Sequence, residues 1–318
     1  MTEFQLFDKA LVENDLPLLK SIEKSDLHNH SGLGFKFEKL KIKYGETIIS
    51  PPTQMDSIEE MTNYIAQILR PYYKTIDGYN FAIKSAFEEA ENDGVKVLKM
   101  SIDCWFTHLF DCNGSKFAKF IETIQKAIAP ELTFLPEIGM SRNVPARELE
   151  KIVLPLIDTG YFKSIDLYGD ENIGNIKDFK SIYKYASKNK LELTAHAGEF
   201  RNANFVRETI DILEVSSIQH GINAAQSKEV IRFLIDNKIQ LNICPSSNLH
   251  LKRVNNIKQH PIKLLFDEGV LVTINSDDIL FFNNTVSDEY LLLYNNNVFS
   301  AKELNQIRMN GLKYANGK

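Results

Sequence analysis

Residues 191–221 have the sequence LELTAHAGEFRNANFVRETIDILEVSSIQHG, and this stretch shows the pattern on which our fold prediction rests. A short apolar run at 191–196 is followed by apolar positions three or four apart at 203–213, and then by a second short run at 217–220. This order predicts a strand, a helix and a second strand that runs parallel to the first. Both predicted strands end in a histidine.

The same alternation continues along the whole chain. Short runs rich in β-branched or apolar residues recur eight times, at 26–30, 95–102, 133–138, 164–167, 191–196, 217–220, 240–243 and 270–274. Segments with helical periodicity lie between them, at 80–92, 116–129, 146–158, 176–189, 203–213, 227–237 and 261–268. Eight strands that alternate with helices are compatible with a closed barrel or with an open, doubly wound sheet. The length of 318 residues favours one α/β domain over residues 1–318, a (β/α)8 TIM barrel.

The longest interruption of this alternation follows the first predicted strand, at residues 31–52. It leads into a helix with a predicted capping box of Ser57 and Glu60. The apolar stripe of this helix consists of Ile58, Met61, Ile65, Ile68 and Leu69. A segment after the first strand of a barrel lies at the mouth where active sites form, so we interpret it as a helical lid. The alternative is a surface elaboration that packs on the barrel through Phe35, Phe37 and Leu40.

Composition excludes several classes of partner. With a net charge of −5 and a pI near 5.9, the chain has no general attraction for nucleic acid or anionic lipid. Three cysteines are too few for a disulfide framework, which favours a reducing compartment. The first residues lack the features of a signal peptide, and no apolar run is long enough to cross a bilayer. We therefore expect a cytoplasmic protein, a monomer or weak homo-oligomer, with a small-molecule substrate and no nucleic-acid or membrane partner.

The first predicted strand carries the strongest local signal, DLHNH at residues 26–30. Side chains two apart on a strand point to the same face, so His28 and His30 would present two imidazoles to one metal ion at the mouth. Histidines at this spacing also occur by chance or for packing, so the pair alone does not establish a metal site.

Further polar residues follow other predicted strands. His196 ends the fifth strand and offers a third nitrogen ligand, while Glu199 lies just beyond it. His220 ends the sixth strand, and Asp277 and Asp278 follow the eighth. Each has a structural alternative, because a histidine can satisfy a backbone group and paired aspartates can cap a helix. Their common position at the carboxyl ends of strands, where barrel enzymes keep their catalytic groups, favours a functional site.

The donor types narrow the choice of metal. Imidazoles with one hard carboxylate suit zinc, although iron, nickel, cobalt and manganese accept the same donors. A catalytic zinc site keeps one position open for water and lowers the pKa of that water to about 7, so we expect a hydroxide nucleophile. Of the remaining histidines, we predict His250 and His260 to be solvated, whereas His108 lies close enough to the predicted mouth to remain a candidate.

Six motifs give the chain a family resemblance. They are DLHNH at 26–30, IDLYGDE at 165–171, TAHAGE at 194–199, QHG at 219–221, CPSSN at 244–248 and NSDD at 275–278. By these motifs, which run in order over most of its length, the chain resembles the adenosine deaminase family. The resemblance implies one zinc ion per chain, bound by His28, His30, His196 and Asp277.

The resemblance also implies roles in a deamination reaction. Glu199 would donate a proton to the purine ring nitrogen next to the reacting carbon, and His220 would orient the attacking water. Asp277 belongs to this catalytic set as well as to the metal ligands. Protonation of the ring nitrogen makes the adjacent carbon electrophilic. The acid and the metal therefore act at the two ends of this carbon–nitrogen bond, and ammonia is the leaving group. The implied substrate-binding residues are His30, Gly169 and Asp278, the last two through hydrogen bonds to the purine ring.

Two positions depart from the family pattern. Where the family often has a polar side chain facing the sugar end of the pocket, this chain has Gly32, which offers no side chain to a ribose 5′-hydroxyl. Ile279 stands where a proline usually follows the paired aspartates. Conversion of adenosine to inosine and ammonia is the simplest expectation, and adenine, a modified adenine or another aminopurine are alternative substrates.

Two other functions remain open. A related amidohydrolase would use a second metal and a bridging lysine; no lysine ends a predicted strand, and Lys99 inside the second one comes nearest. The other alternative is a binding protein that kept the barrel and lost the chemistry, although every expected acid, base and ligand is present.

Overall fold

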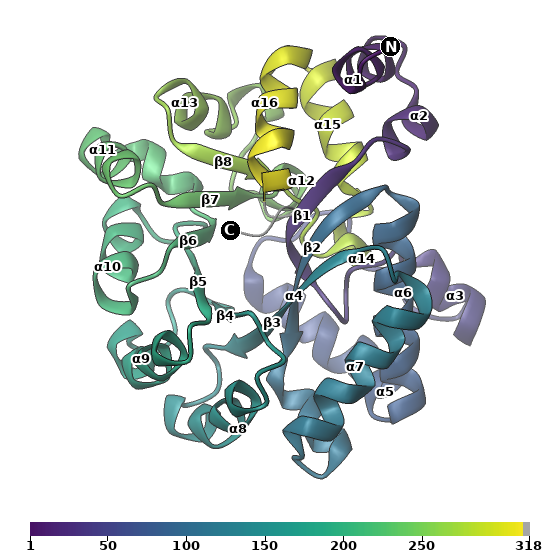
Figure 1. Ribbon diagram of the computed structural model, residues 1–318, viewed down its shortest axis with the longest axis vertical. Coiled ribbons are helices and arrows are strands. Elements are labelled where there is room, and N and C mark those ends of the chain that lie inside the picture. Colours follow the sequence, from purple (N-terminus) through teal and green to yellow (C-terminus); the bar gives the residue numbers. More distant parts are fainter. Residues whose placement is uncertain (314–318) are drawn as a thin grey trace.

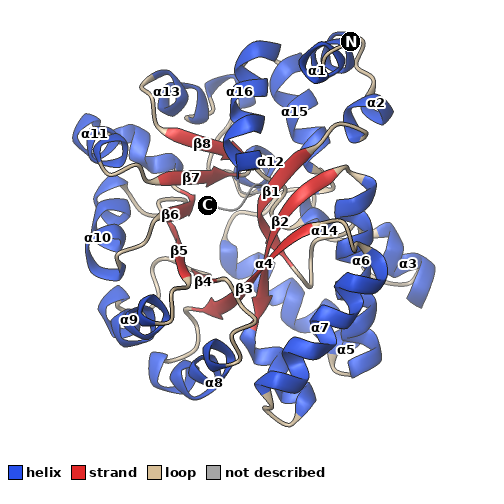
Figure 2. Cartoon of the chain, in the orientation of Figure 1, coloured by secondary structure: helices blue, strands red, loops and turns tan. Residues whose placement is uncertain are grey.

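The computed structural model describes residues 1–313 and contains one sheet of eight parallel strands, in which each strand lies beside its neighbours in the sequence. Figure 1 shows the strands as an inner ring with helices around it, and Figure 2 separates the two by colour. The strands are β1 Lys24–His30, β2 Val95–Asp103, β3 Thr133–Ser141, β4 Ser164–Tyr168, β5 Glu192–Ala197, β6 Ser217–His220, β7 Gln240–Ile243 and β8 Leu271–Ile274. The predicted (β/α)8 barrel is confirmed, because every predicted strand overlaps an observed one.

The ring closes between β8 and β1 through few contacts. Asn29 forms an isolated parallel bridge with Asp277, and the backbone N–H of Asp277 donates to the carbonyl of His28 at 2.9 Å. Earlier in β1, the backbone N–H of Leu27 donates to a side-chain oxygen, Oδ1 of Asn275, at 2.8 Å. Closure therefore ties the DLHNH strand directly to the acidic pair that follows β8.

Amphipathic helices cover the outside of the ring, as predicted. They are α6 Ile76–Asn92, α7 Gly114–Ile128, α8 Ala146–Asp158, α9 Lys180–Lys188, α10 Ala203–Leu213, α11 Lys228–Asp236 and α13 Ile262–Asp267. In α10 the Asn202 side chain caps the first turn, and Val206 and Ile210 lie on the buried face against the strands. The helix predicted at 176–189 is divided, because its first turn is the 3-10 helix η3 Ile176–Phe179.

Four further helices complete this side of the molecule, namely α1 Glu3–Val12, α2 Leu16–Lys20, α15 Val286–Asn295 and α16 Ala301–Leu312. Helices α15 and α16 pack against β1 and β8, and α1 and α2 pack on these two helices. Arg308 of α16 is buried there and donates to Glu3 of α1 at 3.0 Å. Shorter helices occupy the loops, namely η2 Cys104–Phe110, η4 Ile222–Gln226, α12 Pro245–His250, η5 Ile257–Gln259 and α14 Ile279–Phe282. Within residues 1–313, no helix combines the length and apolarity needed to span a membrane.

The insertion after β1 forms α3 Glu38–Tyr44, α4 Ile58–Tyr64, the π-helix η1 Ile65–Leu69 and α5 Arg70–Tyr73. Pro71 explains the π-turn, since proline lacks a backbone N–H and its ring crowds the carbonyl one turn earlier. Of the two hydrogen bonds of the predicted capping box, one forms and the other does not. Ser57 accepts from the backbone N–H of Glu60 at 3.2 Å, but the Glu60 carboxylate accepts from the N–H of Asp56 rather than from Ser57.

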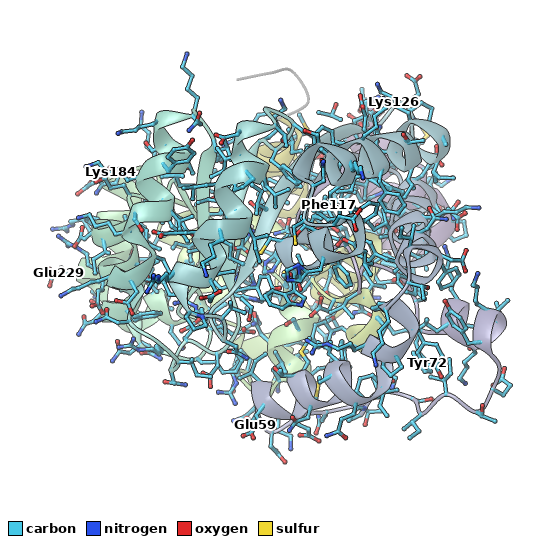
Figure 3. All side chains as sticks on the ribbon, turned by 90° about the horizontal axis from the view of Figure 1, so that it is seen from below. Glu59, Tyr72, Phe117, Lys126, Lys184 and Glu229 are labelled. Atoms are coloured by element: carbon cyan, nitrogen blue, oxygen red, sulfur yellow. The ribbon has the colours of Figure 1, made fainter. Side chains whose placement is uncertain are left out.

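This insertion lies across the carboxyl ends of the strands. In Figure 3, Glu59 and Tyr72 of the insertion lie toward one end of the molecule, and α7 runs from Phe117 to Lys126 toward the opposite end. Because barrel helices run antiparallel to the strands, the insertion covers the end at which the strands finish. Its apolar cluster joins residues of the insertion to loops after β2, β5 and β8, and includes Phe35, Leu40, Met61, Tyr64, Tyr73, Phe106, Phe200, Leu280 and Phe281. The insertion therefore packs on the barrel and also covers its mouth. It has features of both alternatives, the helical lid and the surface elaboration.

Candidate active site

The polar residues at the strand ends are held by unusual backbone turns. His220, with φ 62°, and Asp277, with φ 59°, both adopt the left-handed conformation that side-chain-bearing residues rarely take. Gly198 after β5 has φ 77°, and a Cβ on it would lie 2.2 Å from Cγ2 of Val206, so only glycine fits there. Such conformations persist where the surrounding structure enforces them, and they concentrate at functional sites.

Three histidines from β1 and β5 meet inside the mouth. His28, His30 and His196 each offer one ring nitrogen, and these nitrogens all lie within 4.8 Å of one another. Asp277 reaches the same place, with its Oδ1 3.4 Å from Nε2 of His28 and 3.5 Å from Nε2 of His30. The structure therefore brings the four predicted metal-ligating residues together.

Buried acceptors behind the cluster fix the orientation of two rings. Nδ1 of His196 lies 3.1 Å from Oδ1 of Asp166, and Nδ1 of His28 lies 3.4 Å from the carbonyl of Asn242. An Nδ1–H that donates to such an acceptor leaves the Nε2 lone pair directed away from it, which is the arrangement of metal-binding histidines. Sequence analysis gave no role to Asp166, although a carboxylate inside the apolar strand of IDLYGDE was a usable signal.

Two observations indicate that the cluster fits a divalent cation. Nε2 of His28 is buried and has no hydrogen-bond partner among residues 1–313. Burial lowers the pKa of His28 to about 4 and lowers the pKa of His196 well below its ordinary value, so both imidazoles keep their lone pairs at neutral pH. Neutral imidazoles beside one carboxylate are a donor set suited to zinc.

A second set of donors, His28, His220 and Cys244, fits less well. The Cys244 sulfur lies 3.5 Å from Nδ1 of His28, the nitrogen that also faces the carbonyl of Asn242. Burial raises the pKa of the Cys244 thiol well above its ordinary value, whereas a metal binds the thiolate. The nitrogen and carboxylate set is therefore the better candidate.

Glu199 lies beside this cluster and is almost fully buried. Its Oε2 is 3.5 Å from Nε2 of His220, which in turn is 3.8 Å from Oδ2 of Asp277. Burial, and then the negative charges of Asp277 and Glu171, raise the pKa of Glu199 well above its ordinary value. A carboxyl group that holds its proton at neutral pH can act as a general acid.

The turn that carries Glu199 is anchored by Glu171, which sequence analysis quoted only as part of a motif. The Glu171 carboxylate accepts from the backbone N–H groups of Gly198 at 3.1 Å, of Glu199 at 2.9 Å and of Arg201 at 2.8 Å. Glu171 is itself buried. The loop after β4 therefore positions the candidate acid at the end of β5.

The predicted substrate-binding residues lie around the same cluster. Gly169 follows Tyr168, whose ring centroid is 5.5 Å from that of His30, and has φ 101°. Asp278 is buried next to Asp277, and its Oδ1 has no hydrogen-bond partner in the part of the chain that the structure describes. Burial, followed by the charges of Asp277 and Glu199, raises the pKa of Asp278 well above its ordinary value.

The insertion contacts Gly32 directly. The hydroxyl of Tyr73 donates to the Gly32 carbonyl at 2.9 Å, and a Cβ on Gly32 would lie 3.8 Å from the Tyr73 ring. Burial raises the pKa of Tyr73, so this hydroxyl stays protonated and can donate. Gly32 therefore offers only its backbone to the site, and its carbonyl is already bonded to Tyr73.

The remaining candidates lie elsewhere. His108 is exposed, with Nδ1 3.0 Å from the Cys112 sulfur, and does not join the cluster. Lys99 forms a buried ion pair of 3.0 Å with Glu192 at the start of β5, far from the strand ends that bear the histidines. This placement disfavours Lys99 as a bridging ligand between two metals.

The prediction of solvated histidines in the loops is wrong. His260 is only 2 % exposed, and its Nε2 lies 3.2 Å from Oδ1 of Asn248. His250 is half-buried, and its carbonyl accepts from the N–H of Met55 at 2.9 Å. Both errors have one cause, because the covering segments come from parts of the chain that local sequence patterns do not reveal.

Barrel and site together define an α/β-barrel protein with a candidate metal-ligating cluster and a buried carboxyl group at the carboxyl ends of its strands. The comparison with known families makes this specific: residues 82–316 match the adenosine deaminase model, and the chain belongs to the adenosine deaminase family. It is accordingly a hydrolase that acts on C–N bonds of cyclic amidines.

Individual relatives agree with this assignment. A candidate adenosine/adenine deaminase of Treponema pallidum is 35% identical over 274 residues, which cover 86% of this chain and 92% of that one. The crystal structure of an adenine deaminase from Arthrobacter aurescens has a TM-score of 0.76 at 23% identity and covers 91% of this chain and 92% of its own. An amidohydrolase from Burkholderia ambifaria, solved with bound Zn, has a TM-score of 0.76 at 17% identity, with coverages of 93% and 86%. The two solved structures support the fold alone.

Proposed function

We propose that this protein is a zinc-dependent deaminase of an adenine-type purine, which exchanges the amino group of the ring for oxygen and releases ammonia. The observation that carries the proposal is the buried carboxyl group of Glu199 beside a cluster of three histidines and Asp277. Deamination of this kind requires a proton donor close to the group that activates water, and here Glu199 lies beside the candidate metal-ligating residues.

The residues that would hold one zinc ion are His28, His30, His196 and Asp277. When bound there, zinc supplies a Lewis acid and lowers the pKa of a coordinated water to about 7. Asp166 and the carbonyl of Asn242 support this assignment, because they orient the rings of His196 and His28 from behind.

The chain's own groups supply the proton chemistry and the binding. Burial raises the pKa of Glu199 well above its ordinary value, so we assign Glu199 as the proton donor to the purine ring nitrogen beside the reacting carbon. We assign the orientation of the attacking water to His220, which lies 3.5 Å from Glu199. We infer that Asp278, whose buried Oδ1 has no partner within residues 1–313, and the backbone at Gly169 hold the ring by hydrogen bonds.

A specific observation supports a second candidate substrate that is not an ordinary nucleoside. At Gly32 no side chain is available for a ribose 5′-hydroxyl, and the Gly32 carbonyl is already bonded to Tyr73. Free adenine or a modified adenine is therefore the second candidate substrate, next to adenosine.

The test is a substrate panel followed by ultraviolet absorbance and ammonia release, together with metal analysis. The panel contains adenine, adenosine, deoxyadenosine, AMP and N6-modified analogues, and we expect turnover of at least one. Zinc at one ion per chain supports the proposal, whereas two metal ions per chain would favour the related amidohydrolases. If none of these purines reacts, the proposed substrate class is wrong, and amines of guanine and pterins are the next compounds to test.

A further inference from the structure

Behind Glu199 and His220 lies a chain of buried hydrogen bonds that starts at a backbone amide. The N–H of Ile262 donates to Nδ1 of His260 at 3.1 Å, and Nε2 of His260 is 3.2 Å from Oδ1 of Asn248. Nδ2 of Asn248 donates to Oε1 of Glu199 at 2.9 Å and also lies 3.4 Å from Nδ1 of His220. Asn248 is fully buried, and the other three side chains are at most 5 % exposed.

The backbone amide fixes the proton of His260. An amide N–H can only donate, so Nδ1 of His260 must accept, and its ring proton must be on Nε2. Burial lowers the pKa of His260 to about 3, which keeps the ring neutral in this single tautomer at physiological pH.

His260 in turn fixes the amide of Asn248. The Nε2–H of His260 needs an acceptor, and Oδ1 of Asn248 is the atom that faces it. The reversed amide would place an N–H₂ group against this N–H, two donors in contact in a buried site. Nδ2 of Asn248 is therefore held toward Glu199 and His220.

The two hydrogens on Nδ2 of Asn248 determine the positions of two further protons, one on Glu199 and one on His220. Oε1 of Glu199 accepts one of them, so a proton on this carboxyl group would be on Oε2, the oxygen 3.5 Å from Nε2 of His220. Nδ1 of His220 accepts the other, so the ring proton of His220 is on Nε2, which also faces Oδ2 of Asp277. Both protons then lie on the side of the histidine cluster, where a substrate would react.

We propose that Asn248 and His260 are positioning residues that determine which oxygen of Glu199 and which nitrogen of His220 carry the proton. This inference rests on the proposed deaminase function for its catalytic consequence, while the proton positions belong to the resting protein. Asn248 contacts Oε1 of Glu199, not the oxygen that faces His220, and His260 lies behind Asn248, so we expect an effect on the rate of the chemical step rather than on binding.

The direct test is nuclear magnetic resonance of the zinc-loaded protein labelled with ¹⁵N-histidine, without substrate. Long-range proton–nitrogen correlations distinguish the two neutral tautomers, and we expect Nε2–H for both His260 and His220. Nδ1–H at either ring overturns the proposal. This measurement needs neither a variant nor activity, so it remains decisive if the substrate panel fails.

A pair of variants tests the catalytic consequence on whichever purine is turned over. His260→Leu removes the donor to Asn248, and we expect kcat to fall about 10- to 100-fold, which is part of the roughly 10²- to 10⁴-fold that proton-transfer catalysis contributes. KM and zinc content should stay at the parent values. His260→Gln keeps an N–H₂ group near the position of Nε2 and should recover most of the lost kcat.

The melting temperatures of both variants separate this role from simple packing. A packing role would make kcat follow the melting temperature and would give no recovery with glutamine. Equal losses in the two variants, or a parent-like kcat in His260→Leu, would overturn the inference.

Discussion

Oδ1 of Asp166 lies 3.1 Å from Nδ1 of His196, and both side chains are buried at the centre of the barrel. The two residues come from neighbouring strands, β4 and β5, and the contact leaves the opposite nitrogen of His196 facing the histidine cluster. A carboxylate in this position holds the ring in one orientation and makes its other nitrogen a stronger donor.

Replacing Asp166 should therefore weaken the metal site without removing a ligand. Asp166→Asn keeps the size and one acceptor oxygen but removes the charge, and we expect zinc affinity or turnover to fall about 10- to 100-fold. Competition with a chelator measures the affinity. Asp211→Asn, at an exposed position on α10, is the matched control and should bind zinc as the parent does. Unchanged zinc affinity and unchanged turnover in Asp166→Asn would show that the contact between Asp166 and His196 contributes only to packing.

Glu199→Gln should separate metal binding from chemistry. The amide has nearly the shape of the carboxyl group but cannot give up a proton, so we expect full zinc content and a loss of about 10²- to 10⁴-fold in turnover. Ammonia release and elemental analysis give the two quantities. The surface variant Glu229→Gln controls for loss of one acidic side chain. Ammonia release equal to that of the parent would remove Glu199 from the mechanism.

Asp277→Ala should act on the metal itself. Its Oδ1 lies within 3.5 Å of the Nε2 atoms of His28 and His30, so its removal takes away the one carboxylate of the proposed ligand set. We expect substoichiometric zinc after dialysis against a chelator, under conditions in which the parent keeps its metal. Full occupancy in the variant would exclude Asp277 as a ligand.

The sequence allowed the barrel and the histidine cluster to be predicted for one physical reason. Parallel strands buried on both faces appear as short apolar runs, and residues at their carboxyl ends share one end of the barrel, so His28, His196 and Asp277 could be grouped without coordinates. The turns at His220 and Asp277 were not predictable, because their left-handed backbone is enforced by surrounding packing.

The supporting residues could not be derived in the same way. Asp166 contacts a residue 30 positions away, and Asn248 contacts Glu199 49 positions away, so their partners follow from tertiary structure alone. His260 was predicted to be solvated because it lies outside any apolar periodicity, yet it is buried as part of a hydrogen-bonded chain. Local sequence patterns therefore identify the candidate ligands and acids more readily than they identify the residues that orient those groups.

A last prediction concerns stability rather than catalysis. Glu289 of α15 is fully buried and accepts from the backbone N–H of Ser246 at 3.2 Å, and burial raises its pKa from an ordinary value near 4.5 to about 8. Between these two values the folded protein keeps a proton that the unfolded chain has lost. The free energy of unfolding should therefore decrease as the pH rises through this window.

Glu289→Gln removes this titration and retains an oxygen that can accept from Ser246. Compared with the parent, the variant should gain stability toward the upper end of the window, by an amount on the order of a few kcal/mol. Urea unfolding of both proteins at the two ends of the window measures the difference, and subtracting the curves cancels all other titrating groups. Parallel stability curves for parent and variant would mean that Glu289 is already ionised in the folded protein, and that its contact with Ser246 offsets the cost of burying the charge.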